Sequence, residues 1–511
     1  MDIFMPELSA TTDTSSFTLS LSMTWDENLQ SGSTDFQLQV ETVPPAESTT
    51  STTKSIPTSY LGPSPNELHD IRSKAEKMNS EGCLEKFIAE YVSERKCCIK
   101  LRFQNPWDEN LSTSSNIQRL EWEVLEVKIM YWIREVYCSL RHIFAYENQL
   151  SEYVFEGLGN ASTAHPCFIA IVTDPLAQLL DFPEALCSCR RSPERLQKIL
   201  LLYTRFSLLI AVIDYYFGAS EEGKSIRVRV DSILSRLGEV VRLTLYDLEA
   251  AILGDLDKYP SSVGEIHRLT KYITKYIIYV SDNQATLEDL IVSKPLISSG
   301  NAMISELEVR ELGRLTPLAA HLLWIIIILR LNLESKSKSY QDPSLTNLFM
   351  MNNVHYIVQG IRKSEVLIKM VGDYLYKLEE NVQQAMSNYL KATWDPVVYC
   401  FRDEGLQVVR WCFIPCVPRN VLKDRVKKFN KLFAETYCNQ KMWTVPDLSL
   451  RQEVQQSIED KLIPTYRNYL GKLKSHIVSR KRSEKYILYS VGELEDRILE
   501  LFSGPIPLDH M

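Results

Sequence analysis

The sequence predicts an all-α fold, an elongated rod of stacked antiparallel helical bundles that follows a disordered N-terminal tail. Apolar residues recur every three or four positions through most of the chain, which is the spacing of helices with one buried face. Glycine, which tight hairpins and dinucleotide-binding loops require, is scarce at 18 of 511 residues. The 45% hydrophobic and 24% charged residues exclude wholesale disorder, collagen and an integral membrane protein.

Residues 1–66 form the predicted tail. They are rich in Ser and Thr, contain several prolines, and carry acids but a single base, Lys54. Such a segment cannot bury enough apolar surface to offset the entropy lost on ordering. The next segment, residues 67–115, has mixed charge and apolar residues at helical spacing, so one or two short helices are expected there.

Helical periodicity dominates residues 116–505. The apolar steps between Leu125 and Ile143, and between Val230 and Ile252, each predict one long amphipathic helix. Further helices are expected over residues 194–217, 262–281, 302–333, 345–393, 419–440, 447–475 and 490–502. Breaks are expected at Asp174-Pro175, at Asp181-Phe182-Pro183 and between Pro415 and Pro418. Consecutive helices with short links pack antiparallel, which predicts the rod.

The longest apolar stretch runs from Leu315 to Leu329 and contains Pro317 and His321. It falls short of the roughly 20 residues that a membrane-spanning helix needs. We therefore expect a buried helix rather than a membrane span. The N-terminus lacks the basic and apolar regions of a signal peptide, and the 11 cysteines form no short framework, so a reducing cytosol is the expected compartment.

One segment matches an enzyme motif. Residues 218–225 (GASEEGKS) fit the phosphate-binding P-loop pattern, in which a strand leads into a loop whose amides hold phosphate. The residues before it are long enough for a helix, and Glu221 and Glu222 would place two carboxylates beside the phosphates. A solvated link between two helices is the favoured interpretation, and a P-loop nucleotide hydrolase is the less favoured alternative.

Other catalytic and metal-binding patterns are weak. The sequence contains neither HExxH nor GxSxG. His165, Cys167, Cys187 and Cys189 could in principle converge on zinc, but Cys-x-Cys is not the usual ligand spacing and buried thiols are common. We predict no catalytic residues, no metal and no cofactor.

The informative feature is the distribution of charge. Residues 419–485 hold 16 Lys and Arg against 7 Asp and Glu, a local charge of +9, whereas the whole chain carries −8. Arg419, Lys423, Lys427 and Lys431 recur every fourth residue and would form a stripe roughly 18 Å long on a helix whose Leu422, Val426, Phe429 and Phe433 face the core. The candidate lipid-binding residues are Lys423, Arg425, Lys427, Lys428, Arg480, Lys481, Arg482 and Lys485.

Three interpretations of these bases compete. They can simply solvate a helix, as on many Lys-rich helices. They can bind anionic lipid, because clustered bases near such a surface contribute about 1 kcal/mol each. Nucleic acid is disfavoured, since aromatic stacking platforms and a recognised reading module are lacking. The concentration of bases at one end of an otherwise acidic chain favours the lipid.

Several blocks resemble the plant-type seventy-kilodalton subunit of the exocyst, the complex that tethers secretory vesicles to the plasma membrane. The blocks fall in the family's order and are residues 264–272 (GEIHRLTKY), 332–338 (NLESKSK), 348–358 (LFMMNNVHYIV), 422–430 (LKDRVKKFN), 443–447 (WTVPD) and 484–489 (EKYILY).

The resemblance implies a non-catalytic rod at residues 116–505 that is recruited to phosphatidylinositol bisphosphate through its C-terminal end. It also implies contacts with other exocyst subunits and Rho-type GTPases, and a cytoplasmic protein held peripherally at the plasma membrane. The matching lipid-contact position is Lys485, and Leu488 stands where family members can carry a second Lys.

A second departure lies near the N-terminus. Family members generally place a sizeable helical and coiled-coil region before the block with Trp122 and Glu123, whereas residues 67–115 would be a short remnant of it. The resemblance is therefore to divergent, N-terminally shortened members of the plant family. For such a member, an exocyst-independent interaction scaffold in plant defence is the alternative function.

Overall fold

The helices that the computed structural model describes belong to one compact unit, which begins at Pro65. The structure describes residues 63–103, 117, 119–159, 163–218, 220–255, 262–294, 305–402, 409–411, 414–416, 419–476 and 487–504. Residues 1–62 of the predicted tail lie outside the described residues. The tail's expected end at residue 66 is slightly wrong, because Pro65 and Asn66 already belong to the first helix.

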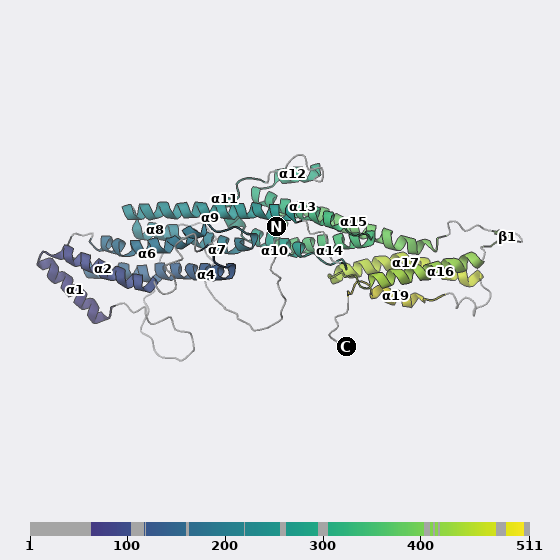
Figure 1. The fold of residues 1–511 in the computed structure, drawn as a ribbon, viewed down its shortest axis with the longest axis horizontal. Coiled ribbons are helices and arrows are strands. Elements are labelled where there is room, and N and C mark those ends of the chain that lie inside the picture. Colours follow the sequence, from purple (N-terminus) through teal and green to yellow (C-terminus); the bar gives the residue numbers. More distant parts are fainter. Residues whose placement is uncertain are drawn as a thin grey trace. The chain divides into compact units, whose positions relative to one another are not determined.

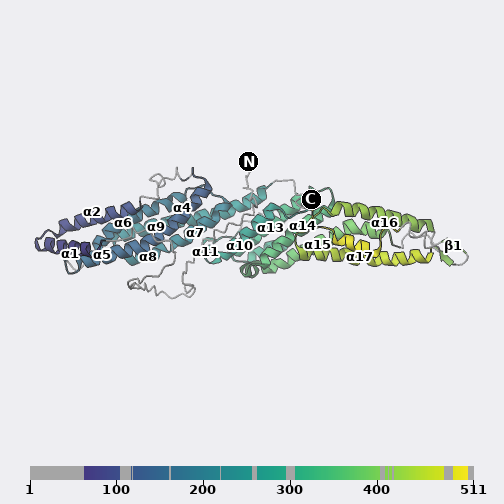
Figure 2. The same cartoon turned by 90° about the horizontal axis from the view of Figure 1, so that it is seen from below.

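The unit that begins at Pro65 is helical almost throughout its described length (Figures 1 and 2). Its first part contains α1 (Pro65–Ser80), α2 (Leu84–Phe103), α4 (Trp122–Cys138), α5 (Ala145–Phe155), α6 (Ala164–Leu186), α7 (Leu196–Ser207), α8 (Leu209–Phe217) and α9 (Glu221–Gly254). Its second part contains α10 (Arg268–Asp282), α11 (Gln284–Leu290), α12 (Glu306–Arg314), α13 (Pro317–Ser337), α14 (Pro343–Arg362), α15 (Glu365–Tyr399), α16 (Arg419–Gln440), α17 (Leu448–His476) and α19 (Val491–Leu499).

Each helix packs against helices that lie within a few positions of it in the chain order. In the first part α6 packs against α2, α5 and α9, and α9 packs against α7 and α8. In the second part α14 and α15 form an antiparallel pair, and α15 continues beside α16 and α17 (Figure 2). The predicted all-helical rod of successive bundles is confirmed. A short antiparallel hairpin of β1 (Val409–Trp411) and β2 (Ile414–Cys416) interrupts the helices between α15 and α16.

The expected breaks at Pro175 and Pro183 are wrong, because α6 continues through both prolines. Pro183 has no N–H to donate to the carbonyl of Leu179, one turn earlier. The indole Nε1 of Trp132 donates to that carbonyl instead, at 2.6 Å. A tertiary donor thus replaces the missing backbone hydrogen bond, and the helix does not have to end.

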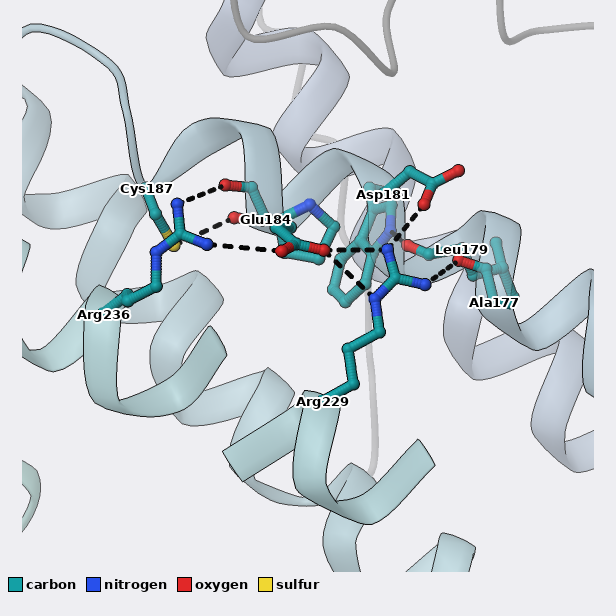
Figure 3. Close-up of polar contacts among 9 residues, drawn as sticks. Ala177, Leu179, Asp181, Glu184, Cys187, Arg229 and Arg236 are labelled. Carbon is teal, nitrogen blue, oxygen red and sulfur yellow. Dashed lines mark hydrogen bonds and ion pairs between the residues drawn. The ribbon is translucent and has the colours of Figure 1, made fainter. Parts of the chain in front are cut away.

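An ionic cluster fastens the same part of α6 to α9 (Figure 3). The Arg229 guanidinium lies 2.6 Å from Asp181 and 2.8 Å from Glu184, and it donates to the carbonyl of Ala177 at 2.9 Å. Arg236 approaches the other oxygen of Glu184 at 3.3 Å. Each of these carboxylates is therefore matched by a guanidinium, so the cluster is a structural clamp on the proline-containing helix.

Two other expected helices are divided. The range 302–333 splits because Thr316 caps α13, its Oγ1 accepting from the N–H of Ala319, and Pro317 occupies the first turn. The range 345–393 splits because the chain reverses at Lys363-Ser364, and the Ser364 hydroxyl accepts from the N–H of Leu367 to start α15.

Smaller interruptions divide two further expected helices. Residues 194–217 form a 3₁₀ turn at Pro193–Arg195 followed by α7 and α8. The range from Leu125 to Ile143 passes from α4 into a π-helical segment at Ser139–Phe144.

The apolar stretch from Leu315 to Leu329 forms most of α13. Its side chains from Leu318 to Leu329 are buried, which confirms the prediction of a core helix. Two described helical ranges, Pro193–Phe217 and Pro317–Ser337, are long and apolar enough by composition to cross a membrane. The second is mostly enclosed by other helices, which is what a core helix of this composition requires.

Candidate functional site

The candidate surface lies on α16, and the inner side of this helix explains how that surface is held. Val426, Phe429 and Phe433 are buried, as the spacing predicted. The ring of Phe429 lies 4.6 Å from that of Phe401 and 5.1 Å from that of Tyr466. Because the aromatic residues fix the rotation of α16 about its axis, they also fix which of its side chains face outward.

The opposite side of α16 gathers positive charge. We call it the basic face and define it by Lys423, Arg425, Lys427, Lys428 and Lys431. Lys427, Lys428 and Lys431 are exposed, whereas Lys423 and Arg425 are partly buried at the two edges. The side chain of Arg419, at the start of the predicted stripe, lies outside the described part of the chain.

Two acids are interleaved with these bases. Asp424 lies 3.9 Å from the Lys427 ammonium, and Glu435 lies 3.9 Å from that of Lys431. All four side chains are at least half exposed, and exposed pairs at this distance contribute little. Among the described residues, the five bases of the basic face thus outnumber the two acids beside them, which leaves a positive excess in this part of the chain.

Arg425 and Lys428 also affect a neighbouring thiol. The Arg425 guanidinium donates to the backbone carbonyl of Arg402, which ties α16 to the end of the preceding helix. Burial raises the pKa of the Cys400 thiol, while the positive charges of Lys428 and Arg425 oppose this rise. These two bases of α16 therefore lie close to the end of α15.

The second predicted cluster, Arg480, Lys481, Arg482 and Lys485, lies outside the described residues. The chain returns to the described part close to α16. The Tyr466 hydroxyl donates to the carbonyl of Tyr489 at 2.6 Å, and the Tyr489 ring lies 5.1 Å from that of Phe433. Leu488, which stands where family members can carry a second Lys, is exposed.

The P-loop match lies where two helices meet, and its last five residues, 221–225, belong to the second of them. α8 runs into it, Gly218 has a φ of +52°, and α9 begins at Glu221. The Ser220 hydroxyl caps α9 by accepting from the N–H of Gly223, and Lys224 pairs with Glu221 at 2.6 Å. The expected link between two helices is therefore present, and the strand that a P-loop requires is replaced by α8.

The four candidate zinc ligands are separated by the length of α6. His165 and Cys167 lie in its first turn, whereas Cys187 and Cys189 follow its last residue, Leu186. Burial raises the pKa of the Cys167 thiol and of the Cys187 thiol to about 11. Among the described residues, no group of three or more His, Cys, Asp or Glu side chains is placed to hold a metal ion.

The structure brings together three of the sequence blocks that carry the family resemblance, residues 264–272, 348–358 and 443–447. Asn353, on α14, uses its whole amide to hold the segment before α10. Its Oδ1 accepts from the N–H of His267 at 2.8 Å and from the Thr270 hydroxyl at 2.6 Å. Its Nδ2 donates to the carbonyls of Glu265 and Phe349 at 3.3 and 2.8 Å.

The neighbouring Asn352 joins a third block to the same place. Its Nδ2 donates to the carbonyls of Gly264 and Thr444 at 2.7 and 2.8 Å, and the N–H of Thr444 donates to the carbonyl of Val263 at 3.0 Å. Gly264 has a φ of +76°, and a Cβ there would lie 3.0 Å from Leu348.

Sequence reasoning missed the role of these blocks as a structural junction. The available signal was the pair of adjacent amides, Asn352 and Asn353, which interrupts a run of apolar residues from Leu348 to Val354.

Comparison with known proteins identifies the family that these blocks resemble. Residues 130–500 match the family model for the C-terminal part of the Exo70 exocyst complex subunit. The chain is 31% identical to exocyst complex component EXO70A1 of Arabidopsis thaliana over 86% of its own length and 66% of the relative. It is 32% identical to exocyst complex component EXO70C2 of the same plant, over 85% of its own length and 60% of the relative.

The chain thus spans between 60% and 66% of the length of these two plant relatives. Among solved structures it is similar to Exo70 of S. cerevisiae, with 14% sequence identity and a TM-score of 0.46. That similarity covers 86% of this chain and 80% of the yeast chain.

Proposed function

Since the chain belongs to the Exo70 family of exocyst subunits, we propose that it acts as a non-catalytic component of the exocyst vesicle-tethering complex in exocytosis. In this role it binds plasma-membrane phosphoinositide through the basic face of α16 and the neighbouring cluster Arg480, Lys481, Arg482 and Lys485. The observation that carries the lipid-binding part is the positive excess on the outer side of α16, which its aromatic inner side holds toward solvent.

The charge on this surface suits reversible attachment. Bases near an anionic leaflet contribute about 1 kcal/mol each, so the five bases of the basic face can hold the protein at a membrane without an inserted helix. A phosphoinositide headgroup carries several negative charges and can pair with more than one of them. The protein is thereby placed peripherally at the cytoplasmic face of the plasma membrane.

The expected partners are the other exocyst subunits and a Rho-type GTPase. The relatives are named as exocyst components, which supports the first expectation. Co-purification from cells would test it. Recovery of this chain with the other subunits supports the tethering role, whereas recovery without them favours the exocyst-independent scaffold in plant defence.

Sedimentation with vesicles tests the lipid-binding part. Wild-type protein should sediment with phosphatidylcholine vesicles containing phosphatidylinositol bisphosphate and not with pure phosphatidylcholine. Replacing Lys427, Lys428 and Lys431 with Ala should weaken the binding at least tenfold, since three favourable charges of about 1 kcal/mol each are lost.

A matched variant controls for net charge. Lys86, Lys100 and Lys369 are exposed on other helices, and their replacement with Ala removes the same charge from the molecule. This variant should bind like the wild type. Equal loss in both variants, or wild-type binding that salt does not weaken, would refute the proposed surface.

A further inference from the structure

The link between α6 and α7 contains a serine-proline pair with a distinctive charge pattern. Residues 190–195 read RRSPER. The chain has three Ser-Pro or Thr-Pro pairs, and their hydroxyl residues are Ser64, Ser192 and Thr316. Only Ser192 has two bases directly before it and a base, Arg195, three residues after it. Protein kinases distinguish substrates partly by such charge patterns, so this pair is the candidate for modification.

The backbone at Ser192 suits a kinase substrate, which binds as an extended chain. Its φ is −160° and its ψ is 143°, an extended conformation that the following proline favours. Ser192 is partly exposed, and residues 190–192 belong to no helix or strand. The next three residues form one 3₁₀ turn, in which the N–H of Arg195 donates to the carbonyl of Ser192 at 3.0 Å. Such short turns have poor hydrogen-bond geometry, so opening this one to place Ser192 in a kinase cleft costs little free energy.

Three arginines flank this serine, and they differ in their contacts. The Arg191 guanidinium lies 2.9 Å from the carboxylate of Asp247 on α9. The Arg195 guanidinium donates to the carbonyl of Arg190 at 2.8 Å and lies 5.0 Å from the centre of the Trp122 ring. Arg190 is exposed, and among the described residues no carboxylate pairs with its guanidinium. Arg190 is therefore the base of this link that can bind a new anionic group without giving up an ion pair.

An acid contacts the Ser192 hydroxyl in the unmodified chain. The hydroxyl donates to one carboxylate oxygen of Glu194, and the other oxygen accepts from the Tyr272 hydroxyl of α10 at 3.4 Å. A phosphate on Ser192 carries a charge of about −1.5 to −2 and repels Glu194. Arg190 lies two residues away, at most about 7 Å along the chain, and its guanidinium can bind phosphate through two parallel hydrogen bonds. Phosphorylation would thus replace a carboxylate contact at Ser192 with a guanidinium contact.

We infer that Ser192 is phosphorylated by a proline-directed protein kinase and that the Arg190 guanidinium binds the resulting phosphate. In this reaction the Ser192 Oγ forms a bond to the γ-phosphorus of ATP, and the bond from that phosphorus to the bridging oxygen breaks to release ADP. The hydroxyl proton passes to a carboxylate of the kinase. The modification changes a contact between the start of α7 and α10, because Glu194 joins Ser192 to Tyr272. The inference is independent of membrane binding.

Phosphorylation of the full-length protein tests the site. The protein is incubated with a proline-directed kinase and ATP, and phosphorylated peptides are identified by mass spectrometry. Wild-type protein should accept most of its phosphate at Ser192 and little at Ser64 or Thr316, and Ser192→Ala should lose the main site. Ser188→Ala is the matched control, because Ser188 is an exposed serine of the same link that no proline follows. This variant should accept phosphate at Ser192 like the wild type.

Titration of the phosphorylated protein tests the role of Arg190. Phosphorus NMR follows the second ionisation of phosphoserine as pH changes. A guanidinium beside the phosphate favours its doubly charged form, so the pKa in the wild type should lie below the ordinary value for phosphoserine. Arg190→Gln should return this pKa to the ordinary value. Arg310→Gln, at an exposed position of α12, removes the same charge and should leave the titration unchanged.

Three results would overturn the inference. Ser192 could stay unmodified while the same kinase labels a short serine-proline peptide, which would show that the folded chain withholds this serine. Equal labelling of Ser64, Ser192 and Thr316 would show that the surrounding bases confer no preference. A phosphoserine titration that is the same in wild type and Arg190→Gln would overturn the binding of the phosphate by that arginine.

Discussion

The carboxylate of Glu308 helps to hold the short helix α12 against the core, beside the buried Leu312 of the same helix. Glu308 is buried and accepts from the Tyr374 hydroxyl at 2.6 Å and from the N–H of Ser305 at 2.9 Å. Arg330 lies 3.0 Å and Lys377 3.2 Å from the same carboxylate. Burial disfavours its charge, but the hydrogen bonds from Tyr374 and Ser305 and the charge of Arg330 outweigh this and lower the pKa of Glu308 to about 2.

The lowered pKa of Glu308 predicts a pH dependence of stability. A carboxylate with a depressed pKa stabilises the fold above its unfolded-state pKa of about 4.5, and this contribution is lost as pH falls toward 2. Glu308→Gln should therefore lower the free energy of unfolding at pH 7 by about 2–3 kcal/mol and flatten its fall below pH 4.5. Glu306→Gln, at an exposed position of the same helix, is the control for thermal melting across this pH range. Identical acid profiles for wild type and Glu308→Gln would contradict the assignment.

Individual helices show both the power and the limit of sequence reasoning. The helices α16 and α17 were predicted almost to their ends, because their buried residues recur every three or four positions, whereas α9 begins at Glu221, nine residues before the expected start at Val230. The continuation of α6 through Pro183 was not, because the donor to Leu179 is a side chain 47 positions away in the sequence. The turn before α15 was readable but missed, since Arg362 and Lys363 end one helix and Ser364 caps the next.

The candidate site was also predictable only in part. Local sequence predicts that bases recur at every fourth residue of α16. It also predicts the burial of Val426, Phe429 and Phe433. The approach of Asp424 and Glu435 to the lysines depends on rotamers, and the junction at Asn353 depends on contacts more than 80 positions apart, which periodicity cannot reveal.

At Leu179 the carbonyl accepts from the Trp132 indole instead of a backbone N–H, and this replacement gives a prediction for α6. Trp132→Phe keeps most of the buried ring but leaves the carbonyl of Leu179 without a donor, so it should destabilise the protein by about 1–3 kcal/mol. Pro183→Ala restores a backbone N–H one turn after Leu179. In the Trp132→Phe background it should therefore recover part of the loss, measured as a shift in the thermal midpoint. Strictly additive effects of the two substitutions would show that they do not share this carbonyl.

At the scale of the whole molecule, positive charge is concentrated in one segment, and the rest of the chain is acidic. Residues 419–485 carry +9 in a chain of net charge −8, which leaves −17 for the remainder. At physiological salt the Debye length is about 8 Å, so acids elsewhere on a chain of this size are screened from a membrane that the basic face touches. Local charge on α16, and not the net charge of the protein, should then determine vesicle binding.

Neutralising the acids that border the basic face tests this conclusion by a gain of function. Asp424→Asn with Glu435→Gln removes two negative charges that lie 3.9 Å from Lys427 and Lys431. This variant should bind phosphatidylinositol bisphosphate vesicles about tenfold more tightly and lose affinity more steeply with added salt. Glu85→Gln with Glu94→Gln makes the same change in net charge at exposed positions of α2 and should bind like the wild type. If both double variants gain equally, net charge governs binding, and the basic face has no special role in reaching the membrane.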